Sequence, residues 1–134
     1  MLSRADRAVV RERGRELTLI RTTEVTHETL PLWAPVDRPE EENKLYGDWL
    51  RKTVGLNAVD FPTDEAQKSP PVLQVDYLRG QQLLGTLELI EDLAEYEDSP
   101  QRYRARGERT PGGVIVPRFA ALKIIQDLDN LLSD

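Results

Sequence analysis

The sequence predicts an α+β domain: a mostly antiparallel sheet built from two hairpins plus short strands, with two helices packed on it. Apolar and polar residues alternate in several short runs, a pattern typical of strands that bury one face. Two segments, about 39–54 and 117–132, instead carry apolar residues at steps of three and four, as amphipathic helices do. The strands come in runs and the helices stand apart from them, which favours α+β over alternating βα units.

The chain is predicted to be a single domain over residues 1–134. Its length is that of one ordinary domain, and 39% of its residues are apolar, enough for a core of its own. Residues 1–7 could form a disordered tail before the first strand. No apolar run approaches the ~20 residues of a membrane-spanning helix, so we expect no membrane insertion by this chain.

The first expected element is a β-hairpin over residues 8–20. Its turn is placed at Arg13-Gly14, and Leu17 and Leu19 alternate with polar residues after it. Arginines fill the outward positions, which suits strands with one exposed face. The polar, β-branched residues that follow are interpreted as a loop or a weak edge strand.

A proline-rich segment carries the first tryptophan, Trp33. Pro31, Pro35 and Pro39 exclude both a helix and a central strand around it, because proline lacks a backbone donor. We therefore expect the segment to cross the domain in extended form, with Trp33 as an anchor in the core.

The first helix is predicted to run from about residue 39 to residue 54. Asp37 stands three residues before Glu40, as in a capping box, and a proline fits the first turn. Trp49 belongs to an apolar stripe at helical spacing and is the second candidate core anchor. Gly55 is a natural end for the helix.

The second hairpin is predicted to pair residues 72–78 with residues 83–90 through a turn at Arg79-Gly80. The stretch 81–96 also fits a helical stripe. Gly85 in its middle, and the turn before it, favour the strand. Between the first helix and this hairpin we expect a short extended stretch and a loop, over residues 58–62 and 63–71.

The last third of the chain is predicted to add two strands and the closing helix. An acidic loop over residues 91–100 leads to an alternating strand over 101–106. A turn over 110–113 precedes a short apolar strand over 114–116. Pro117 is then expected to open a helix whose apolar stripe runs to residue 132.

The distribution of charge argues against a nucleic-acid partner. The formal charge is −6, of which the first 21 residues carry +3 and the rest −9. Nucleic-acid-binding modules usually carry a net basic footprint, which this chain lacks. Cysteine is absent, which excludes disulfides, thiolate metal sites and cysteine nucleophiles.

The residue patterns of common catalytic and cofactor sites are not found. His27 is the only histidine, and Pro31 stands where a zinc-binding helix would need its second histidine. The Gly112-Gly113 pair precedes a predicted strand, whereas a phosphate loop leads into a helix. The acidic residues between Glu88 and Asp98 are interpreted as solvated charge. We therefore predict no catalytic residue, no metal site and no cofactor.

The alternating strand places three arginines on one face of the sheet: Arg102, Arg104 and Arg106. One interpretation is cross-strand pairing with acids of the neighbouring strand, such as Glu88. The functional interpretation is a docking face for an acidic surface of another protein. On this basis the three arginines are the candidate partner-binding residues.

Several segments occur in an order that a known family shares. They are residues 17–21, 33–36 with their tryptophan and prolines, 57–61, 71–75, 85–89, 103–106, 114–116 and the closing leucine-bearing helix. Together they resemble an uncharacterised domain family repeated in auxiliary proteins of gliding-motility-type ABC transport systems. The resemblance implies an accessory role without catalytic residues. It also implies an extracytoplasmic location if the chain is one domain of such a protein, whereas the bare chain would be cytoplasmic.

The leading functional hypothesis is a non-enzymatic protein-interaction or assembly domain, an accessory within a transport- or motility-associated complex. One alternative is a small hydrolase or lyase that uses carboxylates such as Glu91 or Asp92. Another is a small-molecule-binding regulatory domain in which Trp33, Trp49 and Tyr46 line a cavity instead of filling the core.

Overall fold

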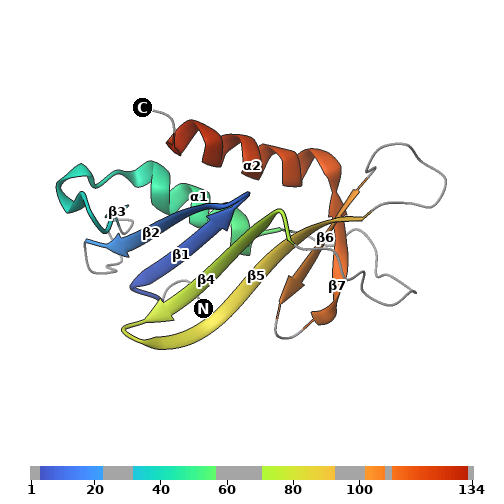
Figure 1. Ribbon diagram of the computed structural model, residues 1–134, viewed down its shortest axis with the longest axis horizontal. Helices are drawn as coiled ribbons and strands as arrows, with labels where there is room; N and C mark the ends of the chain where they lie inside the picture. The colour runs from blue at the N-terminus through green and yellow to red at the C-terminus, as the bar shows by residue number, and fades with distance from the viewer. Residues whose placement is uncertain (1–3, 23–31, 57–70, 93–101, 108–109, 133–134) are drawn as a thin grey trace.

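The computed structural model describes residues 4–22, 32–56, 71–92, 102–107 and 110–132. These residues form a seven-stranded antiparallel sheet with two helices on one of its faces (Figure 1). The predicted α+β class is confirmed. The expected stretch over residues 58–62, His27 and most of the acidic loop lie outside the described residues. Among the described residues, no helix is both long and apolar enough to cross a membrane.

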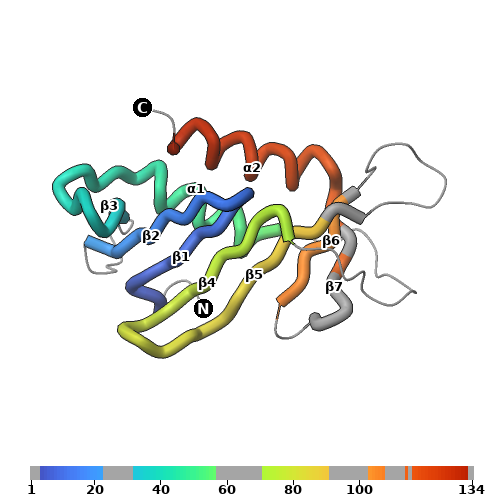
Figure 2. Tube along the Cα trace, viewed as in Figure 1, coloured from blue at the N-terminus to red at the C-terminus, as the bar shows by residue number. Residues whose placement is uncertain are grey.

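The strand order in the sheet is β3-β2-β1-β4-β5-β6-β7, and the two hairpins meet where β1 pairs with β4 (Figures 1 and 2). The strands are β1 (Arg7–Glu12), β2 (Arg15–Arg21), β3 (Trp33–Pro35), β4 (Leu73–Arg79), β5 (Gln82–Asp92), β6 (Arg102–Gly107) and β7 (Thr110–Pro117).

Both predicted hairpin turns are found, and positive φ angles explain their sequences. Arg13 and Gly14 have φ angles of 49° and 81°, the pair of left-handed residues that a two-residue type I′ turn requires. In the second hairpin Gly80 has a φ angle of 60°. Glycine adopts this backbone region without the steric cost that a Cβ atom adds.

For the segment 81–96, both a strand and a helix fitted the sequence. The structure has a strand from Gln82 to Asp92. β5 pairs with β4 along its length, with a register shift near Tyr77 that leaves Leu84 as the extra residue. Glu91 and Asp92, which were predicted to begin the acidic loop, instead belong to β5 and pair with β6.

The first helix, α1 (Lys44–Val54), begins later than predicted. Pro39–Glu41 form only a short 3₁₀ turn, and the extended backbone of Glu42 separates this turn from the helix. The helix is capped by Asn43, whose side chain accepts a hydrogen bond from the Leu45 N–H at 2.9 Å. Asp37 is therefore not the cap.

The segment from β7 to the start of α2 also differs from the prediction. Thr110–Pro117 is one strand, so residues 110–113 do not form a separate turn. Pro117 ends this strand, and α2 (Arg118–Leu132) starts at the next residue.

The expected tail over residues 1–7 is too long. Ala5 is fully buried, and Arg7 is the first residue of β1. Asp6 joins the sheet as well: its N–H donates to Leu78 O, and its carboxylate accepts from the Gly80 N–H, both at 2.9 Å. Order thus begins before the first predicted strand.

The core lies between the helices and one face of the sheet. Trp33 and Trp49 are 1% and 2% exposed and pack in the same cluster. The Trp49 indole Nε1–H donates to the Ile124 carbonyl at 2.8 Å and so joins α1 to α2. This core contains residues from all seven strands and both helices, including Ala8, Val10, Leu19, Leu50, Leu73, Val75, Tyr77, Leu89, Tyr103, Val116, Ala121 and Leu128.

Ion pairs fix the helices at their outer surface. Asp127 of α2 accepts from Lys52 of α1 at 3.1 Å and from Lys123 at 3.2 Å. Partial burial opposes ionisation, but these two hydrogen bonds outweigh it and lower the pKa of Asp127. Two residues further along α2, Asp129 pairs with Arg15, which also pairs with the buried Glu12.

The turn glycines give a first prediction. We expect Gly14→Ala and Gly80→Ala each to lower the free energy of unfolding by about 1 kcal/mol, because the methyl group meets open space but the φ angle is strained. Urea denaturation followed by circular dichroism measures the change. Gln81→Ala in the second turn is the control, and an equal loss there would contradict the φ-angle explanation.

A second prediction concerns the indole of Trp49. Trp49→Phe should lower the free energy of unfolding by about 2 kcal/mol, since it removes a buried hydrogen bond and part of a packed ring. The same urea titration tests it. Leu45→Ala, at a half-exposed position on the same helix, should change stability by well under 1 kcal/mol. Equal effects of the two substitutions would argue against the role assigned to the indole.

Candidate functional site

The two candidate arginines whose side chains are described, Arg104 and Arg106, do not form an exposed docking face. Arg104 is only 1% exposed, and it lies in register between Ile90 of β5, which is equally buried, and Ile115 of β7. Arg106 makes a two-pronged ion pair with Glu88, with both contacts at 3.2 Å. The alternative of cross-strand pairing is therefore what Arg106 adopts. The side chain of Arg102 lies outside the described part of the structure.

A second polar network lies on the same face of the sheet, with residues from β1, β2, β4 and β5. Asp76 on β4 accepts from Arg11 at 2.9 Å, from Thr86 at 2.9 Å and from Gln74 at 3.2 Å. Arg11 also pairs with Glu16, and the bond to Asp76 raises the pKa of Arg11. These contacts pair Arg11 with two carboxylates on neighbouring strands, and they stabilise the outer face of the sheet.

The aromatic residues of the regulatory alternative fill the core. Trp33, Trp49 and Tyr46 are each at most 9% exposed and belong to one packed cluster. The carboxylates of the hydrolase alternative, on Glu91 and Asp92, lie outside the described side chains. Among the described residues, no group of three metal-ligating side chains comes together.

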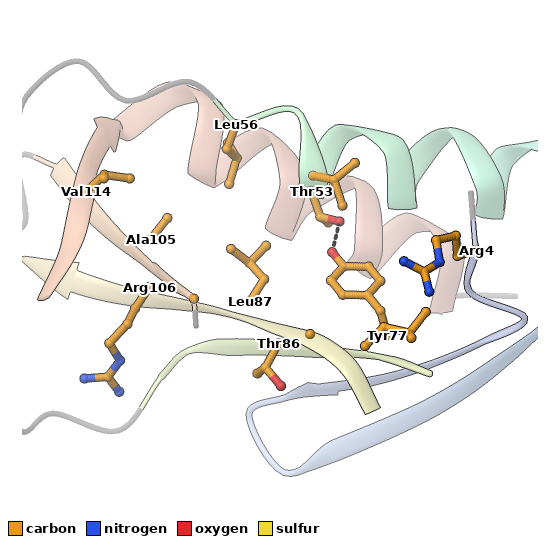
Figure 3. Close-up of a pocket in the computed structure, with 13 residues that line it drawn as sticks. Arg4, Thr53, Leu56, Tyr77, Thr86, Leu87, Ala105, Arg106 and Val114 are labelled. Carbon is orange, nitrogen blue, oxygen red and sulfur yellow. Dashed lines mark hydrogen bonds between the residues drawn. The ribbon is translucent and has the colours of Figure 1, made fainter. Parts of the chain in front are cut away.

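A cleft of about 580 Å³ opens elsewhere, between the C-terminal end of α1 and the helix-facing side of the sheet. Figure 3 shows Leu56 above it, Leu87, Ala105 and Val114 along the sheet, and Arg4 at the end beside Tyr77. The residues that line it are Arg4, Thr53, Val54, Leu56, Tyr77, Leu84, Gly85, Thr86, Leu87, Ala105, Arg106, Gly107 and Val114.

The sequence explains why the cleft forms at this place. α1 ends at Val54, and Gly55 caps it by donating its N–H to Arg51 O at 3.0 Å. Beneath this end the sheet presents small residues, Gly85 on β5 and Ala105 on β6. A short helix above and small side chains below leave space between the two layers.

The walls of the cleft are apolar and incompletely buried. Leu56, Leu84, Leu87 and Val114 are all partly buried hydrophobic residues packed against the core. Thr86 and Arg106 also border the cleft, but their side chains point to the other side of the sheet (Figure 3). The cleft therefore offers an apolar surface that solvent still reaches.

The hydroxyl groups in the cleft are satisfied by each other. Thr53 Oγ1 lies 2.6 Å from Leu50 O and 2.5 Å from Tyr77 Oη. A carbonyl only accepts, so the Thr53 proton goes to Leu50 and the Tyr77 hydroxyl donates to Thr53. Burial raises the pKa of Tyr77 to about 12, against the effect of the Thr53 hydrogen bond, so this phenol is neutral at pH 7.

Arg4 supplies the positive charge of the cleft. Among the described residues that line it, none is an aspartate or a glutamate, and the other cation, Arg106, faces away and is paired with Glu88. The charge of Arg4 therefore stands at one end of an otherwise neutral surface. This geometry can bind an apolar group, and it presents no acid–base pair for catalysis.

A second groove of about 570 Å³ lies between the two helices, on the side away from the sheet. Leu45, Trp49 and Leu131 form its base. Its charged rim pairs with itself, through Asp48 with Arg51 and through Asp127 with its two lysines. We therefore regard the cleft below α1 as the candidate site.

Of the residues that line the cleft, only Arg106 was predicted to be functional, as a candidate partner-binding residue, and its side chain points away from the cleft. The available signal was Gly85, since a glycine inside a strand often marks a bulge or a close approach. Gly85 was used to choose between strand and helix, and the bulge at Leu84 next to it was not foreseen.

No protein-family model, no curated protein and no solved structure matches this chain. The resemblance to the domains of gliding-motility-type transport systems therefore stays a prediction.

The buried phenol gives a third prediction. Tyr77 ionises at about pH 12 in the folded protein and near pH 10 when unfolded, so stability is unaffected below pH 10 and falls as pH rises from 10 to 12. The loss should reach about 3 kcal/mol, and Tyr77→Phe should lack it. Urea denaturation of both proteins between pH 8 and pH 12 tests this, and parallel pH profiles would contradict it.

Proposed function

We propose that this protein is a non-enzymatic binding domain, an interaction or accessory module, and that its site is the cleft between α1 and the sheet. The observation that carries the proposal is the set of partly buried apolar residues, Leu56, Leu84, Leu87 and Val114, which share this one cleft. The volume falls in the range of sites that take small ligands or single side chains.

Burial of apolar surface is the interaction that such a site can provide. Each square ångström of apolar surface removed from water contributes roughly 25 cal/mol, so a ligand that covers several half-buried leucines gains affinity without any new ion pair. The lining favours binding over catalysis, because its described groups include a neutral phenol, hydroxyls and a guanidinium but no carboxylate.

The fourth prediction tests binding with a neutral apolar probe, N-phenyl-1-naphthylamine, whose fluorescence rises in apolar surroundings. We expect the native protein to bind it and Leu84→Gln to weaken binding about tenfold, because a polar amide replaces part of the wall. Titration of the probe at constant protein concentration gives the two dissociation constants.

Leu83→Gln is the matched control. Leu83 is the preceding residue on β5, is 50% exposed and does not line the cleft. It should bind the probe as the native protein does. Absence of binding to the native protein, or equal losses in the two variants with unchanged circular dichroism, would refute the proposal.

A further inference from the structure

We infer that the ligand of this cleft is a single-chain carboxylate amphiphile, of the chemical class of a medium-chain fatty acid, with its carboxylate at Arg4. This inference rests on the proposed function and specifies its ligand. Three properties of the cleft lead to it: its length, the position of its charge and, among the described residues other than Arg4, the lack of free hydrogen-bonding side chains that point into it.

The length follows from the sheet. The cleft runs across β7, β6, β5 and β4, which are neighbours in the strand order, and is lined on them by Val114, Ala105, Leu87 and Tyr77. Three strand spacings of about 4.8 Å make an apolar track of about 14 Å. An extended hydrocarbon chain advances about 1.25 Å per carbon, given bonds of about 1.5 Å at near-tetrahedral angles, so the track has room for a chain of about eleven carbons.

The charge stands at one end of this track. Arg4 precedes β1, the strand that pairs with β4. Along the cleft, Arg4 therefore lies next to Tyr77, at the end away from Val114 (Figure 3). No described carboxylate lines the cleft. A ligand that matches this pattern is apolar over most of its length and anionic at one end, and a guanidinium binds a carboxylate with good geometry.

The hydrogen-bonding groups favour an acyl chain over a peptide. Thr53 and Tyr77 bond to each other, and the side chains of Thr86 and Arg106 point away. An extended peptide would bring amide groups into the apolar track, and each amide without a partner costs about 1–3 kcal/mol. An acyl chain carries no such groups, and its polar head lies where Arg4 is.

The fifth prediction uses displacement of N-phenyl-1-naphthylamine. From displacement of the probe on the native protein, we expect monomeric decanoate to have a dissociation constant about five times lower than that of 1-decanol, which has the same chain length and no charge. Arg4→Gln should remove this preference, leaving decanol binding unchanged. Arg7→Gln, an exposed arginine outside the cleft, should keep the preference and is the control.

The outcomes separate the two proposals. If the probe binds in a Leu84-dependent way but neither decanoate nor decanol displaces it, the amphiphile inference is wrong and the binding function stands. If decanoate and decanol compete equally on the native protein, or if Arg4→Gln leaves the preference intact, the assignment of the carboxylate to Arg4 is wrong. Displacement by an apolar decapeptide amide, without displacement by decanoate, would overturn the inference in favour of a protein segment.

Discussion

The structure depends on one constraint: on a single face of the sheet, two short helices have to cover seven strands. Six strand spacings make the sheet about 29 Å wide, whereas α1 with its 11 residues is only about 16 Å long. α1 packs against β3 and α2 packs against β6 and β7. Among the described residues, the helix layer therefore leaves part of the sheet uncovered beyond the end of α1, and the cleft lies there.

The position of the helix layer is set by a small number of specific contacts. The indole of Trp49 donates to the backbone of α2 in the core, and Lys52 reaches Asp127 at the surface of the same pair of helices. Arg15 ties the far end of α2 to the turn of the first hairpin through Asp129. These contacts hold α1 and α2 together, so the open space is a defined part of the fold that both layers shape.

Much of the fold could be predicted from the sequence because its signals are local. The turn glycines, the alternation in the hairpins and the leucine stripe of α2 each depend on neighbouring residues. The start of α1 was misplaced because Asp37, Pro39 and Glu40 fit a helix start locally, whereas the helix is capped by Asn43. Asn43 also forms a bridge with Trp33 of β3, a contact between distant residues that no local pattern contains.

The candidate site was missed for a related reason. Alternation in β6 correctly separates Tyr103 and Ala105 from the arginines, but it does not say which strands lie on either side. The strand order places β6 between β5 and β7, where Arg104 is buried and Arg106 pairs with Glu88, the partner that the cross-strand interpretation named. A cleft that gathers residues from an N-terminal segment, a helix end and four strands has no signature in any one segment.

The two faces of the sheet therefore differ in the binding free energy that they offer to a partner. On the outer face, Asp76 and Glu88 already hold the described polar groups around them, so a partner would have to break existing bonds to form new ones. On the helix-facing side, four half-buried apolar residues still contact water, and covering them replaces no existing interaction. Binding energy is available where the core is left incomplete, which is why function is assigned to the cleft and not to the charged face.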